Sequence, residues 1–239
     1  MTISPIYTGA PTDERCAVEQ QTYALLDELH IPYTRVDHDE AATMDDCVAI
    51  GAVLGVEICK NLVLTPRNRS AFYLLCMPGD KPFLTKDFSK QIGSSRLSFA
   101  TAEDMQELLG VQPGSASILS LMNDPAHRVT LAIDRQVVES EFFGCHPCRN
   151  TSSVRLKTAD VLEIFLKHTG HEVTVVELKN RFPASSSGAG IFLAPHEKAS
   201  SLTLTRLPAE TGQGGNIAGT IQIKASSVRL CQKQKFFLY

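Results

Sequence analysis

KNLVLTPRNRSAFYLLCMP, residues 60 to 78, contains two apolar runs separated by a polar turn. The runs KNLVLTP (60 to 66) and SAFYLLCMP (70 to 78) are short, and the turn PRNRS joins them. Short apolar runs bounded by turn-forming residues are typical of strands. The segment therefore predicts two strands connected by a turn.

Helix-like runs lie on both sides of this pair. An amphipathic helix is predicted over residues 13 to 30, with Thr12 or Asp13 as its cap and an apolar face made of Val18, Leu25, Leu26 and Leu29. Further helices are expected after Thr43, Thr85, Thr101 and Thr158, whose hydroxyls can cap a first turn. Gly55 is expected to end the helix that follows Thr43.

Strand-like runs alternate with these helices. They are YTRVDH (33 to 38), RVTLAID from residue 128, SSVRL (152 to 156) and EVTVVEL (172 to 178). The order lacks the regular rhythm of a doubly wound parallel sheet. A mixed α+β fold is the prediction.

The composition changes after Leu178, where serine, glycine and proline become concentrated. One domain is predicted over residues 12 to 178, preceded by an N-terminal arm (1 to 11). Residues 179 to 239 form a Ser/Gly-rich basic extension, either disordered or a small β appendage. This extension has eight Lys/Arg against two Asp/Glu, so its charge is +6 and the other 178 residues carry −9.

Composition excludes several classes of protein. No run approaches the roughly 20 apolar residues that a membrane span needs. The seven cysteines are an odd, scattered set, which favours reduced thiols in a cytoplasmic protein. An acidic body also argues against broad binding of duplex DNA, because such binding neutralises many phosphates.

Three segments contain residues suited to chemistry. The segment Gly144 to Thr151 (GCHPCRNT) has a glycine, a histidine and a proline before a strand, as in a ligand-binding loop or an ordinary turn. Its CxxC is either a redox pair or half of a zinc site, although no second CxxC accompanies it. Lys60 lies among apolar neighbours, and Gly114 to Ser117 is a small-residue turn that either cradles an anion or is an ordinary turn.

Together these segments resemble the YbaK and prolyl-tRNA synthetase insertion-domain editing family, and are most similar to the ProX-type alanyl-tRNA(Pro) deacylases. The similarity covers about residues 15 to 178. It rests on ICKNLVL around Lys60, on the run from YLLCMPGDKP to LLGVQPGS, and on GCHPCRNTSSVRL. The resemblance implies a barrel-like mixed sheet flanked by helices.

The resemblance also implies the site residues. Lys60 and His146 are the expected catalytic residues, and substrate-binding positions fall on Asn61, Gly114, Ser115, Ser117, Gly144, Asn150 and Thr151. Arg96, Lys86 and Lys90 are expected to contact tRNA, within a basic stretch that also includes Arg67, Arg69 and Lys81. A proline that relatives often have after the small-residue turn is replaced by Ile118. The ribose 2′-hydroxyl is expected to assist the reaction, with no cofactor and no metal.

The expected function is trans-editing, the hydrolysis of mischarged alanyl-tRNA(Pro) for translation fidelity. The expected partners are the tRNA(Pro) acceptor end carrying a small amino acid and prolyl-tRNA synthetase. Two alternatives stay open: a cysteinyl-tRNA(Pro) deacylase, and a non-catalytic tRNA-binding or synthetase-binding module.

Overall fold

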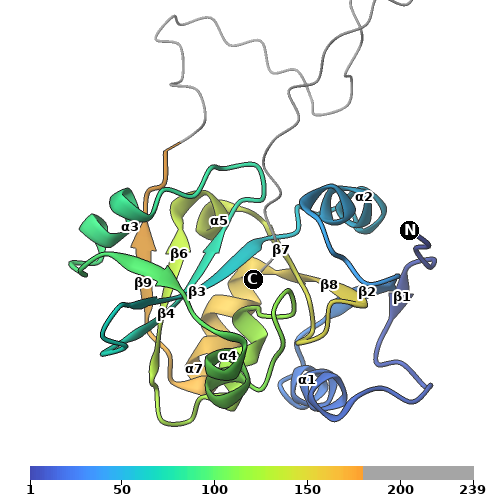
Figure 1. Cartoon of the computed structure of the whole chain (residues 1–239). Helices are drawn as coiled ribbons and strands as arrows, with labels where there is room; N and C mark the ends of the chain where they lie inside the picture. The colour runs from blue at the N-terminus through green and yellow to red at the C-terminus, as the bar shows by residue number, and fades with distance from the viewer. Residues whose placement is uncertain (180–239) are drawn as a thin grey trace, which may run out of the picture. The chain divides into compact units, whose positions relative to one another are not determined.

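The computed structural model describes residues 1 to 179, which fold into two β-sheets with helices packed on them (Figure 1). The strands are β1 (Tyr7–Thr8), β2 (Tyr33–Asp37), β3 (Lys60–Pro66), β4 (Phe72–Met77), β5 (Leu97–Phe99), β6 (Val129–Asp134), β7 (Phe142–Cys145), β8 (Ser152–Lys157) and β9 (Val173–Val176). The α-helices are α1 (Ala17–Glu28), α2 (Met44–Leu54), α3 (Thr85–Gln91), α4 (Ala102–Leu109), α5 (Arg135–Glu139), α6 (Thr158–Asp160) and α7 (Leu166–Thr169). The described residues also contain a 3-10 helix (Ile118–Asn123) and a π-helical turn (Val161–Phe165).

The smaller sheet has the order β1-β2-β8-β7, and all its strands are antiparallel. Helices α1 and α2 lie on opposite sides of it (Figure 1). Val36 belongs to the apolar cluster under α2, whereas Tyr33 on the same strand belongs to the main core. Alternate residues of β2 therefore face the two helices.

The larger sheet has the order β5-β3-β4-β6-β9. Its β3 and β4 are the antiparallel pair predicted from residues 60 to 78, with Lys60 opposite Met77. Strands β6 and β9 extend the sheet in parallel from β4. Helix α4 contributes to the main core on one face, and Phe88 of α3 fills a second cluster with Leu62 and Leu64 of β3.

The predicted mixed α+β class is confirmed, with one correction. The resemblance implied a barrel-like sheet, but in residues 1 to 179 the strands form two separate sheets and no closed barrel. The described residues contain no helix that is both long and apolar enough to cross a membrane.

Two of the predicted helix caps are confirmed and three are wrong. Thr43 and Thr101 each accept a hydrogen bond from the backbone three residues later, and Gly55 ends α2 in the left-handed conformation. Helix α1 starts only at Ala17, so neither Thr12 nor Asp13 caps it. Thr85 and Thr158 are the first residues inside their helices, one position too late for a capping hydroxyl.

The N-terminal residues are attached to the smaller sheet. β1 pairs with β2, and Ile3 bridges to His38. The predicted extension of residues 179 to 239 lies outside the described residues, apart from Lys179.

Candidate active site

Lys60 is the first residue of β3, and its ammonium is held in place. Its Nζ donates a hydrogen bond to the backbone carbonyl of Lys81 over 2.9 Å. The side chain is partly buried, and this burial lowers the pKa of Lys60, although the carboxylates of Asp80 and Glu57 oppose the shift. A desolvated ammonium of this kind interacts strongly with negative charge that develops beside it.

The turn that carries the Lys81 carbonyl is fixed from two directions. The ammonium of Lys81 is buried and forms a 2.7 Å ion pair with Asp134, a fully buried residue at the end of β6. On the other side, the amide of Gly79 donates to the carboxylate of Glu57 over 2.7 Å. The position of the Lys60 ammonium therefore depends on a rigid turn and not on solvent.

Gly144 brings the segment that leads to His146 against the residues before Lys60. The amide of Cys59 donates to the Gly144 carbonyl over 2.8 Å, and Ile58 bridges to Gly144 in parallel. A Cβ atom at Gly144 would lie 2.6 Å from the Glu57 carbonyl oxygen, so a side chain is excluded here. The sequence placed Gly144 in a loop, but it lies within strand β7.

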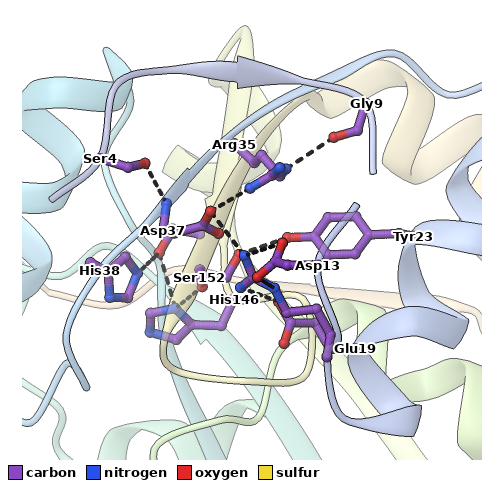
Figure 2. A network of polar contacts seen from close by, with 12 residues as sticks. Ser4, Gly9, Asp13, Glu19, Tyr23, Arg35, Asp37, His38, His146 and Ser152 are labelled. Carbon is purple, nitrogen blue, oxygen red and sulfur yellow. Dashed lines mark hydrogen bonds and ion pairs between the residues drawn. The ribbon is translucent and has the colours of Figure 1, made fainter. Parts of the chain in front are cut away.

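His146 follows β7 and is almost fully buried. Its Nδ1 lies 3.0 Å from the Ser152 carbonyl and 3.1 Å from the Ser153 hydroxyl. The ring of His38 lies beside it, with centroids 5.8 Å apart (Figure 2). Burial lowers the pKa of His146 to about 4; the Ser152 carbonyl opposes the shift and His38 adds to it. The imidazole is therefore neutral at neutral pH.

The buried neutral state of His146 predicts a loss of stability in acid. At pH values above the ordinary 6.5, His146 is neutral in both the folded and the unfolded chain. As the pH falls from 6.5 to about 4, only the unfolded chain takes up the proton, which costs up to about 3 kcal/mol of unfolding free energy. Urea unfolding at pH 7 and at pH 4.5 measures this loss. His146→Asn is expected to show a smaller loss than the wild type, and equal losses would contradict the assignment.

The predicted substrate-binding residues have different surroundings. Asn61 is buried; its Nδ2 donates to the Cys59 carbonyl, while its Oδ1 has no partner among the described residues. Asn150 donates to the Glu40 carboxylate over 3.1 Å, and the Thr151 carbonyl accepts from the His38 amide. Asn61 therefore has a buried acceptor without a partner among the described residues. Asn150 and Thr151 connect the loop that contains His146 to the end of β2.

The small-residue turn packs near the same strands. Gly114 has a φ of +82°, which suits glycine. Ser115 is buried, and Ser117 accepts from the Leu119 amide at the start of the 3-10 helix. Burial raises the pKa of the Cys145 thiol at the end of β7, and the nearby Ser117 side chain opposes this shift. The turn therefore lies close to β7, which leads to His146.

The three predicted tRNA contacts lie together on the surface. Lys86, Lys90 and Arg96 line a hollow of about 600 Å³, together with Thr85, Ser89, Ser94 and Leu97. All three are exposed, and none forms an ion pair with a described residue. Two other members of the basic stretch are neutralised, since Lys81 pairs with Asp134 and Arg69 pairs with Asp104.

The CxxC motif lacks the features of a redox pair. Cys145 and Cys148 are both buried, and burial raises the pKa of each thiol. A reactive thiol needs a lowered pKa and access to its partner. Among the described residues, no three His, Cys, Asp or Glu side chains are grouped as metal ligands.

Sequence reasoning missed His38 and Ser153. Both are buried, and the Nε2 of His38 lies 2.9 Å from the Ser153 hydroxyl. Ser153 lies within the quoted motif GCHPCRNTSSVRL, but nothing in the sequence singled it out. His38 ends a strand-like run, and only the pairing of β2 with β8 brings it to His146.

Comparison with known proteins finds a tRNA-editing domain and two proteins with similar sequences. A family profile of the aminoacyl-tRNA editing domain matches residues 38–164. The prolyl-tRNA editing protein ProX of Acetoanaerobium sticklandii is 31% identical over 160 residues, covering 67% of this chain and 97% of that protein. Prolyl-tRNA synthetase associated domain-containing protein 1 of Mus musculus is 30% identical, covering 70% and 98%.

A solved structure, described as that of a candidate trans-editing enzyme for prolyl tRNA synthetase, has a similar fold. Its TM-score is 0.52 at 18% identity, and the match covers 70% of this chain and 99% of that one. At this identity the match supports the fold alone.

Proposed function

The chain belongs to the aminoacyl-tRNA editing domain family, and from that premise we propose that it hydrolyses mischarged alanyl-tRNA(Pro) in trans. The reaction releases alanine and free tRNA. The single observation that carries the proposal is the desolvated Lys60 ammonium on its fixed turn, close to the strand that leads to His146.

The proposed chemistry needs no protein nucleophile. An aminoacyl ester is already activated, so the main requirements are a positioned water and stabilisation of the oxyanion. In this mechanism Lys60 stabilises the developing negative charge. The Nε2 of His146, which has no hydrogen-bond partner among the described residues, accepts a hydrogen bond from the water or from the ribose 2′-hydroxyl. The free Oδ1 of Asn61 accepts from the α-amino group.

Selectivity follows from the size of the amino acid. An extra methylene changes binding by only about 1–3 kcal/mol, so a synthetase for proline does not strongly exclude the smaller alanine. A second site that is too small for the proline ring hydrolyses the alanyl ester and leaves the correct product intact. The backbone of the turn at Gly114 and of strand β7 at Gly144 is proposed to form the close walls of that site.

The basic hollow is proposed to hold the phosphates of the tRNA acceptor end. In Lys86→Ala/Lys90→Ala, the slope of log K against log salt for tRNA binding is expected to become shallower by about 1.4, since each phosphate contact on a single strand contributes about 0.7. KM should rise while kcat changes little. Lys167→Ala is the control, because Lys167 is exposed and already paired with Glu163. An unchanged salt slope in the double variant would remove these residues from the interface.

The proposed partners are tRNA(Pro) and prolyl-tRNA synthetase, since the names of the relatives refer to both. Cysteinyl-tRNA(Pro) remains the alternative substrate, because its amino acid is also small. A non-catalytic tRNA-binding module remains the alternative class.

The direct test is a deacylation assay. Purified protein is incubated with alanyl-tRNA(Pro), and the alanine released is compared with spontaneous release in its absence. Release well above the spontaneous rate supports the proposal. Binding of the charged tRNA without added release would favour the non-catalytic module.

A further inference from the structure

A chain of polar contacts connects His146 to a second buried histidine. Ser153 of β8 lies opposite Val36 of β2, so the end of β2 brings His38 next to Ser153. The Ser153 hydroxyl lies 2.9 Å from Nε2 of His38 and 3.1 Å from Nδ1 of His146. All three side chains are buried, so water does not compete freely for these contacts.

The partner of the first ring determines where its proton lies. Nδ1 of His38 is 2.8 Å from the Asp39 carbonyl, and a carbonyl only accepts hydrogen bonds. Nδ1 therefore carries the proton in the neutral ring, and Nε2 is an acceptor. Burial lowers the pKa of His38, which keeps the ring neutral. The Ser153 hydroxyl must then donate its proton to Nε2 of His38.

The same reasoning applies to His146. Its Nδ1 lies 3.0 Å from the Ser152 carbonyl, so Nδ1 carries the proton there also. Because the Ser153 proton is used by His38, the Ser153 oxygen is free to accept from Nδ1 of His146. The Nδ1 proton of His146 is then shared between the Ser152 carbonyl and the Ser153 oxygen, and Nε2 of His146 keeps its lone pair.

We propose that Ser153 and His38 are positioning residues that hold His146 in the Nδ1–H tautomer, with Nε2 as the acceptor for the substrate. The inference rests on the proposed function, because it deepens the role of His146 in that site. His38 acts through Ser153 by taking up the hydroxyl proton. Without His38, that proton would turn toward Nδ1 of His146 and favour the Nε2–H tautomer, which cannot accept a hydrogen bond at Nε2.

The test is nitrogen-15 NMR of the histidine rings in the full chain, which distinguishes a protonated ring nitrogen from a bare one. The wild type is expected to show His146 protonated at Nδ1 only. His38→Leu should add the Nε2–H tautomer and lower kcat for alanyl-tRNA(Pro) by about tenfold, with little change in KM. His38→Gln, whose amide oxygen can replace the acceptor, should keep the wild-type signature.

Two further variants separate positioning from structure. Ser153→Ala removes the linking hydroxyl and should also give a mixture of tautomers. Tyr23→Phe removes a different buried hydroxyl, which contacts Ser152 over 2.6 Å, and should leave the His146 signature unchanged. Wild-type His146 protonated at Nε2, or a wild-type signature in both His38→Leu and Ser153→Ala, would overturn the proposal. These spectra do not depend on activity, so they decide this inference even if no aminoacyl-tRNA is hydrolysed.

Discussion

Lys60→Ala is expected to lower the rate of alanyl-tRNA(Pro) deacylation by about 10²–10³-fold, the effect of removing one group that stabilises an oxyanion. The ammonium is partly desolvated and is anchored on the Lys81 carbonyl, and a water molecule in its place would carry no positive charge. The affinity for tRNA should change only modestly, because the proposed phosphate contacts lie at Lys86, Lys90 and Arg96. Single-turnover deacylation and tRNA binding measure the two effects separately.

A fold control accompanies this variant. Lys60→Ala leaves the buried Lys81–Asp134 ion pair intact, so its Tm should stay close to that of the wild type. Lys167→Ala, which removes an exposed lysine, should retain full activity. Wild-type activity in Lys60→Ala would contradict the proposed role of Lys60 in the reaction.

His146→Asn is expected to lower kcat by about 10²-fold. The asparagine amide can still donate to the Ser152 carbonyl, as Nδ1 does, but it has no atom at the position of Nε2. The change therefore removes the proposed acceptor while keeping the buried contact, and general acid–base roles typically contribute about 10²–10⁴-fold. The rate of deacylation at saturating substrate is the measurement.

The loss in His146→Asn should not be rescued by raising the pH. The pKa of His146 is lowered to about 4, so the wild-type ring is already neutral throughout the neutral range. A higher pH therefore does not supply what the variant lacks, which is the Nε2 acceptor. A variant with unchanged kcat would show that His146 has only a structural role.

The local features of the fold were predictable where one short segment determines them. Thr43 and Thr101 each lie directly before a run with an acidic residue three positions later, and both form the expected capping boxes. Thr85 and Thr158 have the same hydroxyl but lie one residue inside their helices. Sequence reasoning does not fix a helix start to one residue, so these two caps were wrong.

The contacts of the site depend on pairing across the chain, which one sequence does not show. Gly144 and Cys145 were interpreted as part of a loop, but they lie in β7, which pairs with β8. The Lys60–Lys81 contact joins residues 21 positions apart. The contact between His38 and Ser153 spans 115 positions and depends on the register of β2 with β8. The resemblance identified Lys60 and His146, whereas their surroundings became visible only in the structure.

The central claim is that this chain removes alanine from tRNA(Pro) and leaves proline in place. Comparison of kcat/KM for alanyl-, cysteinyl-, seryl- and prolyl-tRNA(Pro) tests it most directly. We expect the highest value for the alanyl ester and no hydrolysis of the prolyl ester above the spontaneous rate. Equal hydrolysis of the alanyl and prolyl esters, or hydrolysis of neither, would contradict it.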